Sequence, residues 1–437
     1  MSQLVAVSGL RTIAAGIERQ QVMDVVRAAT FIGTLLLGWV TLHPFESLGD
    51  LQIGDVGAGN ELMTYATFGA LSLLTLALAL RSDARGLATL LSPAFVLFGA
   101  WLLITVVLSF DPATSVKRLS LTICVIAVTA SMMLLPKSQH ELMHWFAISA
   151  LALLAICYLG ILLAPDLSIH LASDPQEPGL AGNWRGAFGH KNMAAAVMVM
   201  VLFLGVYVVS SGLWISGGAI VALASLFLLY SAGKSSLTLC FAVLLLTSIT
   251  GFVRSFWLRA IILLTPLLLL NLLSIGAVMF EGLAGISKLL PFDSTFTGRT
   301  DIWAFALQSL HARLLTGYGF ASFWGSSAIQ HLPEGKEWAG FAAHSHNGYL
   351  DTALGMGVPG LLLLILVLVI LPLKNFQRAT EGGNNGPLAM ALLRIWLFGL
   401  YLSAMESFFL DRSDPIWFTF LLAVFGLHYL ARFRAAN

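Results

Sequence analysis

Charged residues are scarce in this chain. Asp, Glu, Lys and Arg make up 10% of its 437 residues, whereas a soluble domain usually carries about 25%. Hydrophobic residues make up 58%, and the mean hydropathy is +0.87. These proportions exclude an ordinary soluble domain and predict an integral membrane protein. The formal net charge of +1 gives no indication of a nucleic-acid partner.

Cysteine is also rare. Cys124, Cys157 and Cys240 all lie inside apolar segments, where thiols behave as small buried residues. We therefore expect neither a disulfide framework nor a cysteine metal site. The first two dozen residues show no clear cleavable signal, so the first spanning helix is expected to serve as an uncleaved anchor.

Long apolar runs are what the chain has in abundance. A helix needs about 20 mostly apolar residues to cross a bilayer, and twelve runs of that kind occur. They lie at 25–42, 62–80, 87–110, 116–135, 141–164, 191–210, 213–231, 236–253, 257–280, 348–373, 390–410 and 415–432. The predicted fold is therefore all-α, a single polytopic membrane domain over residues 1–437 with about twelve spans. An even number of spans places both termini on one side.

The distribution of Lys and Arg predicts the orientation of these spans. When each residue is assigned to its nearest connecting segment, 13 lie on the side of the N-terminus and 10 on the other. Four of those ten lie in the long 281–347 loop, which the positive-inside rule discounts, leaving six. The bias predicts a cytoplasmic N-terminus and a 281–347 loop on the outer side of the membrane.

The 281–347 loop is the only sizeable segment outside the spans. Thr300 is a candidate cap for a helix that starts near Asp301 and runs over about 300–314. Four apolar residues then recur at spacings of 4, 3 and 4, namely Trp303, Leu307, Leu310 and Leu314. One apolar stripe of this kind predicts a helix lying on or in the outer leaflet.

Three short polar islands interrupt the apolar chain, and the predicted topology places all three on the outer face of the membrane. They are Trp184–Asn192, Thr297–Trp303 and His344–Asn347. Two arginines and a histidine that converge at a membrane surface suit a lipid-linked diphosphate and a hydroxyl that must lose its proton. This convergence is the main functional indication in the sequence.

The two arginines have both a functional and a plain interpretation. Arg299 precedes a helix N-terminus, where backbone N–H groups favour an anion, and its guanidinium suits phosphate oxygens. It could equally be an interfacial arginine, or pair with Asp301. Arg185 lies among glycines that would let the backbone approach a headgroup, or it could be an ordinary interfacial anchor beside Trp184.

The third island offers an imidazole as a base. A neutral histidine near its usual pKa of about 6.5 can deprotonate a sugar hydroxyl, and His344 and His346 are both candidates. Alternatively, these histidines could hold the loop by hydrogen bonds. A metal pair is disfavoured because no third ligand stands at suitable spacing. Near the other islands, Lys191, Asn192 and Lys234 are further polar residues at span ends. Asn192 favours a helix-cap role, and Lys234 favours a plain turn.

The residues of the islands, and the order in which the islands follow one another, resemble those of the bacterial O-antigen ligase/polymerase superfamily. The residues that carry the resemblance are Arg185, Phe188-Gly189-His190-Lys191-Asn192, Gly298-Arg299-Thr300-Asp301-Ile302-Trp303, Gly317-Tyr318-Gly319 and His346-Asn347-Gly348-Tyr349-Leu350. The second island is most similar to the exopolysaccharide polymerase branch that builds succinoglycan-type polymers. The resemblance covers about 180–375, which we treat as the ligase-like core, and the first 160 residues match only as a run of spans.

The resemblance implies a membrane glycosyltransferase (GT-C-like) architecture in the bacterial inner membrane, with its active site facing the periplasm. It implies transfer of a glycan from undecaprenyl diphosphate to an acceptor sugar hydroxyl, with no cofactor and no essential metal. Arg185 and Arg299 would hold the diphosphate leaving group, and His346 would be the catalytic histidine. Substrate contacts are expected from a further set: His344, Lys191, Asn192, Asn347 and Lys234.

Polymerisation of lipid-linked repeat units is the leading functional hypothesis, with the lipid-linked oligosaccharide and an acceptor glycan as partners. Chain-length regulators and export proteins are further expected partners. A ligase that moves finished polymer onto lipid A-core is the alternative within the family, although the glycine-rich surroundings of Arg185 argue against that branch. A transporter or flippase is the alternative from another class. It is disfavoured because span interiors lack charge almost throughout, Glu406 in the 390–410 segment being the main exception.

Overall fold

The computed structural model describes most of the chain, with gaps in connecting segments and at the two ends. The described residues are 2–47, 61–174, 177–289, 299–324, 342–381, 386–411 and 414–433.

Within the described residues, twelve apolar helical segments form the body of the protein, and each coincides with one predicted span. They are α1 (Ser2–Val40), α2 (Glu61–Ala88), α3 (Pro93–Val107), α4 (Pro112–Met132), α5 (Gln139–Leu163), α7 (Lys191–Ser210), α8 (Trp214–Tyr230), α9 (Lys234–Thr250), α10 (Phe256–Met279), α13 (Gly348–Ile365) continued by α14 (Leu371–Glu381), α15 (Gly386–Leu402) and α16 (Pro415–Leu430). Seven of them are long and apolar enough to cross a membrane, and five are shorter apolar helices. The described residues contain no β-strand. The prediction of an all-α, multi-span protein is confirmed.

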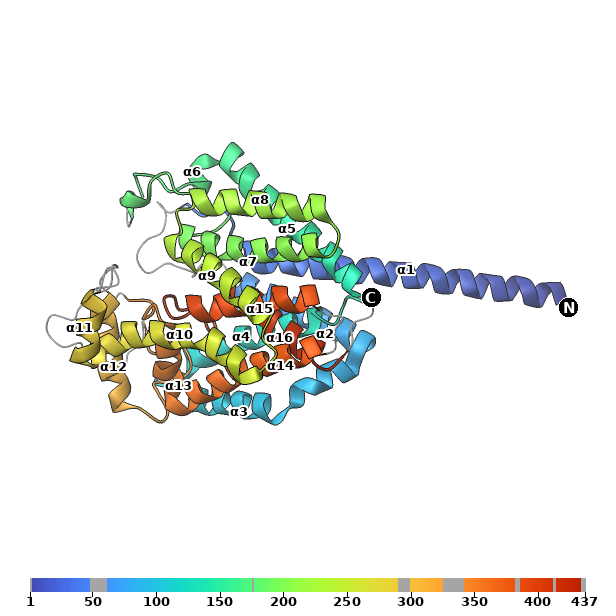
Figure 1. Cartoon of the computed structure of the whole chain (residues 1–437). Helices are drawn as coiled ribbons and strands as arrows, with labels where there is room; N and C mark the ends of the chain where they lie inside the picture. Colours follow the sequence, from blue (N-terminus) through green and yellow to red (C-terminus); the bar gives the residue numbers. More distant parts are fainter. Residues whose placement is uncertain are drawn as a thin grey trace.

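The helices form two groups side by side, with α5 and α7–α9 in one and most of the others in the second (Figure 1). Helices α7, α15 and α16 are the most enclosed, because most of their residues are buried. Peripheral helices and turns instead expose large apolar side chains, such as Ile215 at 91% and Phe252 at 93%. Apolar exposure on this scale suits contact with lipid.

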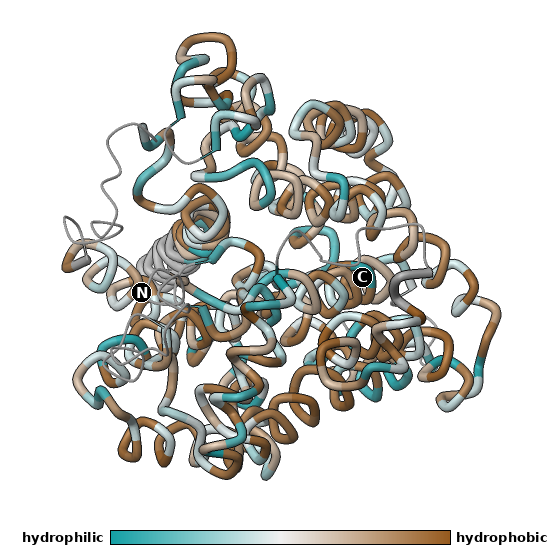
Figure 2. The backbone as a smooth tube through the Cα atoms, turned by 90° about the vertical axis from the view of Figure 1, so that its left-hand side faces the viewer, coloured by the Kyte–Doolittle hydropathy of each residue, from teal (hydrophilic) through white to brown (hydrophobic). Residues whose placement is uncertain are grey.

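Hydrogen bonds between loops define the two ends of the bundle. The connection after α1 meets the connection before α7, where the Phe45 N–H donates to the Ala187 carbonyl at 3.4 Å. The turn between α3 and α4 meets the segment after α12, where the Phe110 N–H donates to the Tyr318 carbonyl at 3.0 Å. These connections all fall on the face predicted to hold the islands, and we call it the loop end. Figure 2 looks onto this end and shows short hydrophilic stretches among mostly hydrophobic helices.

The opposite end carries both termini (Figure 1), and we call it the termini end. There Arg259 Nη1, at the start of α10, donates to Gln377 Oε1 of α14 at 2.7 Å. Lys137, before α5, pairs with Asp24 of α1. Connections alternate between the two ends as the twelve-span prediction requires, so the three islands belong to one end of the molecule.

Two short helices lie across the loop end (Figure 1), α11 (Glu281–Leu289) and α12 (Arg299–Ala312). Helix α12 begins at Arg299, so Thr300 lies inside the first turn and is not its cap. Its buried residues are Trp303, Phe305 and Ala306, which pack against α13 in a small separate core. The expected stripe is only partly covered, since Leu314 is 44% exposed.

A break in α13 ties α12 to the rest of the loop end. Gly357 has a φ of +68° inside the helix, and a Cβ at that position would lie 2.2 Å from the Leu315 carbonyl oxygen. The segment after α12 fills this break: the Tyr318 N–H donates to the Leu354 carbonyl at 2.7 Å, and the Val358 N–H donates to the Leu314 carbonyl at 2.8 Å. Backbone groups released by the break are thereby paired, as the membrane interior requires. The arrangement fixes Arg299 relative to the start of α13.

Two predicted boundaries were wrong. The segment between the predicted spans 348–373 and 390–410 is mostly helical, because α14 continues to Glu381 and α15 begins at Gly386, and the residues 382–385 lie outside the described part. The predicted span at 390–410 ends earlier, at Leu402. Glu406 therefore lies in the loop between α15 and α16 and not within a helix. Apolar composition alone does not reveal this end, because most of residues 403–410 are also apolar.

Candidate active site

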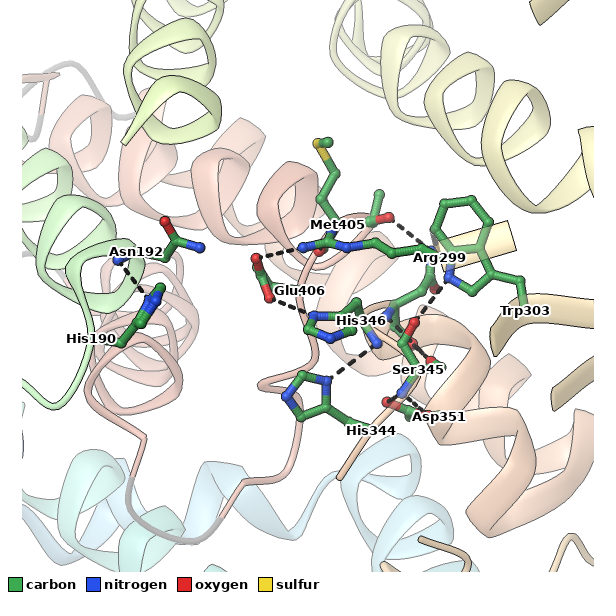
Figure 3. A network of polar contacts seen from close by, with 12 residues as sticks. His190, Asn192, Arg299, Trp303, His344, Ser345, His346, Asp351, Met405 and Glu406 are labelled. Atoms are coloured by element: carbon green, nitrogen blue, oxygen red, sulfur yellow. Dashed lines mark hydrogen bonds and ion pairs between the residues drawn. The ribbon is translucent and has the colours of Figure 1, made fainter. Parts of the chain in front are cut away.

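Glu406 joins two of the predicted site residues through the two oxygens of one carboxylate. Arg299 Nη2 lies 3.2 Å from Glu406 Oε1, and His346 Nδ1 lies 3.2 Å from Glu406 Oε2. Arg299 Nη1 also donates to the Met405 carbonyl. Figure 3 shows the three side chains converging from the start of α12, the start of α13 and the α15–α16 loop. We call Arg299, Glu406 and His346 the Glu406 cluster.

The cluster fixes the proton on His346. Burial alone raises the pKa of Glu406, but the hydrogen bond from His346 and the charge of Arg299 lower it, and the net pKa is below its usual value. An ionised carboxylate can only accept hydrogen bonds, so Nδ1 of His346 is the protonated ring nitrogen. In the neutral form of this ring, Nε2 carries the lone pair that a base requires. The His346 side chain is 34% exposed, so part of the imidazole is accessible from outside the protein.

His346 sits on a backbone conformation that non-glycine residues rarely adopt, with a φ of +56°. Its own N–H donates to Nδ1 of His344 at 3.3 Å, and the two rings meet edge to face at 4.2 Å. Burial, followed by the charge of His346, lowers the pKa of His344. His344 therefore stays neutral and supports the turn that presents His346.

Ser345 lies between the two histidines and is fully buried. Hydrogen bonds fix its backbone to residues of α12 and α13. Its N–H donates to both oxygens of Asp351, at 3.1 and 3.0 Å, and its carbonyl accepts from Nε1 of Trp303 at 2.9 Å. Asp351 also accepts from Nε1 of Trp324 at 2.8 Å. The histidine loop is thus clamped to α12 on one side and to the first turn of α13 on the other, which restricts the position of His346.

Asn347 caps α13. Its Oδ1 accepts from the backbone N–H groups of Tyr349 and Leu350 at 3.1 and 3.0 Å. Its Nδ2 donates to Asn271 Oδ1 at 3.2 Å and to the Ala404 carbonyl at 2.9 Å. The residue is completely buried. These bonds hold the start of α13 against the loop that carries Glu406.

Arg185 lies in different surroundings. It is 1% exposed, and its guanidinium donates to two backbone carbonyls, those of Phe188 at 3.2 Å and Glu46 at 2.7 Å. Its Nε has no hydrogen-bond partner among the described residues. No hydrogen bond within the described residues links Arg185 to the Glu406 cluster. In this structure Arg185 fixes the loop before α7 to the connection after α1.

The start of α7 differs from the prediction in which residue caps it. His190 is the cap, since its Nδ1 accepts from the Asn192 N–H at 3.1 Å, while its Nε2 lies 2.8 Å from Glu177 Oε2. Beneath it, buried His170 pairs with Asp174 at 3.1 Å and accepts from the Lys191 N–H at 3.3 Å. Asn192 therefore does not cap α7. Its side chain is exposed, and its amide points toward Glu406 (Figure 3).

The two predicted lysines lie farther along the same end. Lys191 Nζ donates to the Ala232 carbonyl at 3.2 Å, which ties α7 to the α8–α9 turn. Lys234 is the first residue of α9 and is exposed. The loop end thus carries both lysines on the α7–α9 group, beside the histidine and arginine of the other group.

Several residues that organise this site were not predicted from the sequence. Glu406 was noted only as a charge in an apolar run, and Asp351, Asp174 and His170 were not singled out. The available signal was the rarity of acids in so apolar a chain, because a carboxylate retained near a membrane usually has a partner. Its two partners, 60 and 107 residues away, could not be identified from spacing.

Chemically, the cluster combines an oriented imidazole with an adjacent guanidinium. The imidazole can accept a proton from a hydroxyl, and the guanidinium can stabilise negative charge on a phosphate oxygen. No group of three or more His, Cys, Asp or Glu side chains within the described residues is arranged to hold a metal ion.

Comparison with known proteins finds similarity over part of the chain. The O-antigen ligase family model matches residues 218–365, which include Arg299 and His346. The chain is also 32% identical over 232 residues to the exopolysaccharide production protein ExoQ of Rhizobium meliloti (strain 1021). That match covers 48% of this chain and 50% of ExoQ, so the chain spans about half the length of this curated relative. The matches and the multi-span fold agree with the resemblance of the polar islands to the O-antigen ligase/polymerase superfamily.

Proposed function

We propose that this protein lengthens a polysaccharide by transferring glycan from a polyprenyl diphosphate, undecaprenyl diphosphate in bacteria, to a sugar hydroxyl of a second lipid-linked repeat. The observation that carries the proposal is the sharing of one carboxylate, Glu406, by Arg299 and His346. We further propose that the loop end faces the periplasm of the inner membrane, as the excess of Lys and Arg on the other side favours.

In the proposed reaction, Nε2 of His346 accepts the proton of the acceptor hydroxyl. The hydroxyl oxygen forms a bond to the anomeric carbon while the bond from that carbon to the diphosphate oxygen breaks. The bond electrons leave with the diphosphate, and attack from the opposite side inverts the anomeric configuration. Positioned acid–base catalysis contributes about 10²–10⁴-fold, and no metal or nucleotide takes part.

Arg299 is proposed to stabilise the leaving diphosphate. Its bonds to described residues use one N–H toward Met405 and one toward Glu406, and a guanidinium has five N–H donors. The remaining donors are proposed to contact phosphate. One positioned donor of this kind can be worth about 2.7–4 kcal/mol in the transition state. Asn192, Lys191 and Lys234 are proposed to line the donor or acceptor path, since they lie at the same end.

Arg185 is proposed as a positioning residue for the loop that carries His190 and Asn192. Its burial and its two backbone acceptors support this role. Direct contact with the diphosphate, which the family resemblance implies, would require the Glu46 connection to move away. Asn347 is likewise proposed to act through the loops it joins, and His344 through the turn of His346.

The experiment is polymerisation by the purified protein in proteoliposomes that hold a lipid-linked repeat unit as both donor and acceptor. The proposal expects a ladder of longer lipid-linked glycans and one polyprenyl diphosphate released for each new linkage. Polymer that forms only after addition of a lipid A-core acceptor would identify a ligase. Movement of the lipid-linked glycan across the bilayer, without any change in glycan length, would support the transporter alternative and contradict the proposal.

A further inference from the structure

A second polar site lies at the termini end, far from the Glu406 cluster along the bundle. A cavity of about 680 Å³ opens there between α1, α2, the turn before α5, and α16. This volume falls within the usual range of about 300–1,000 Å³ for sites that bind small molecules. The cavity's cationic lining residues are Arg27, Arg81 and Lys137.

Arg27 is the most informative of the three. It lies near the start of the predicted span 25–42, at the termini end of α1. It is only 8% exposed, and its Nε has no hydrogen-bond partner among the described residues. A buried cation with an unpaired donor favours an acceptor or an anion nearby.

The cations have few side-chain acceptors among the described residues. Arg27 and Lys137 both approach the same oxygen, Oδ1 of Asp24. Two other nearby carboxylates are engaged by backbone: Asp83 accepts from an N–H of α2 at 2.9 Å, and Glu141 accepts from the Lys137 N–H at 2.8 Å. An anion in the cavity would supply further acceptors for these cations.

The walls of the cavity indicate what kind of anion. Apolar side chains, including Leu78, Leu142 and Phe433, line it together with the cations. The helices that border it also expose apolar side chains to the outside: Val25 is 68% exposed and Leu80 is 53% exposed. A soluble anion would gain nothing from such surroundings, whereas a lipid would place its headgroup on the cations and its chains along these helices.

We propose that this cavity binds the phosphate headgroup of an anionic phospholipid from the leaflet at the termini end. The headgroup phosphate contacts Arg27, Arg81 and Lys137, and it links α1 to α2 and to the turn before α5. This inference does not depend on the proposed glycan transfer, because it uses residues at the opposite end of the bundle.

The test is native mass spectrometry of the purified full-length chain after equilibration with dioleoyl phosphatidylglycerol and dioleoyl phosphatidylcholine. The wild type is expected to retain the anionic lipid preferentially. The double substitution Arg81→Gln with Lys137→Gln is expected to weaken retention of phosphatidylglycerol roughly thirtyfold, since each cation near an anionic lipid contributes about a factor of five. Both side chains are at least partly exposed, so the fold should persist.

A matched control keeps the total charge change the same. Arg254→Gln with Lys374→Gln removes two exposed cations from the same end, outside the cavity lining, and is expected to leave lipid retention at the wild-type level. Equal loss in both double variants, or unchanged retention in the cavity variant, would overturn the proposal. Displacement of the lipid by an equal concentration of inorganic phosphate would overturn the assignment to a lipid. Arg27→Lys, which keeps the charge and loses Nε, should retain part of the preference.

Discussion

Arg185 and Arg299 lie at the same end of the bundle, but their guanidinium groups meet different partners. Arg185 is 1% exposed and donates to the carbonyls of Phe188 and Glu46. The Arg299 side chain is 18% exposed, and one of its bonds goes to the carboxylate that also holds His346. The first guanidinium is fixed by backbone, and the second is fixed by an ionisable group next to a base.

This difference distinguishes an arginine that stabilises the fold of the loop end from an arginine that can contact a ligand there. A buried cation that satisfies backbone carbonyls stabilises the fold, and its removal leaves those carbonyls unpaired. A partly exposed cation beside a carboxylate and an imidazole can meet a ligand without any rearrangement of the chain. Two arginines with the same expected role in the sequence therefore lead to different predictions for stability and for activity.

The largest effect on activity is expected in the Glu406 cluster, which contains the partly exposed Arg299 and His346. His346→Ala removes the proposed base and should lower the polymerisation rate about 10²–10⁴-fold, with little change in thermal stability because the side chain is 34% exposed. His311→Ala, an exposed histidine on α12, is the control and should keep the wild-type rate. A His346→Ala protein that lengthens glycans normally would remove the imidazole from the mechanism.

Arg299→Gln should come next, with a loss of about 10²–10³-fold in transfer and a folded protein by thermal melting. The measurement is kcat and KM for the lipid-linked donor in proteoliposomes. Arg299→Lys should recover part of the rate, because it keeps the charge and loses the fork of donors. Wild-type kinetics in Arg299→Gln would show that the diphosphate is held elsewhere.

Arg185→Met is expected to act mainly on the fold. Removal of hydrogen bonds from a buried charged group should cost about 2–4 kcal/mol of stability, visible as a lower melting temperature and a lower yield. Transfer per folded molecule should fall less than in Arg299→Gln. A normal melting temperature together with a loss of transfer as large as that of Arg299→Gln would instead support direct contact with the diphosphate.

The smallest expected effect is a dependence of the protein's stability on pH. Because burial lowers the pKa of His344 in the folded state, the unfolded chain binds more protons below its ordinary pKa of about 6.5. Stability should therefore decrease as the pH falls below that value. His344→Asn keeps an acceptor for the His346 N–H and should flatten this slope in melting temperatures measured across the range. The lowered pKa of His170 adds a slope of the same sign, which remains in the variant; an unchanged total slope would argue against His344.

The positions of the spans were predictable because the bilayer imposes length and apolarity on every crossing segment. The ends of the spans were less so. Residues 403–410 follow α15 and continue its apolar composition, yet they form a loop. They are held by tertiary bonds, from the Gly348 N–H to the Ser403 carbonyl at 2.8 Å and from Asn347 to Ala404 at 2.9 Å. No local pattern encodes those partners.

The residue types of the site were predictable from the sequence, but the contacts between those residues were less predictable. The islands supplied Arg299 and His346, and the structure places both on Glu406. The exchange of roles at α7 was not predictable: Asn is the commoner helix cap, but Glu177 and His170 around His190 favour His190 in that position. Capping preferences describe averages, and here the neighbouring side chains decide.

The most direct test of the account is a double-mutant cycle between Glu406→Gln and His346→Ala, measured as initial rates of glycan transfer in proteoliposomes. If Glu406 acts by orienting His346, its substitution should slow the wild type about 10–10²-fold and should have almost no further effect once the imidazole is gone. The double variant is then predicted to match His346→Ala alone. Losses that multiply, so that the double variant is slower by the product of the two single effects, would contradict a single centre built on the shared carboxylate.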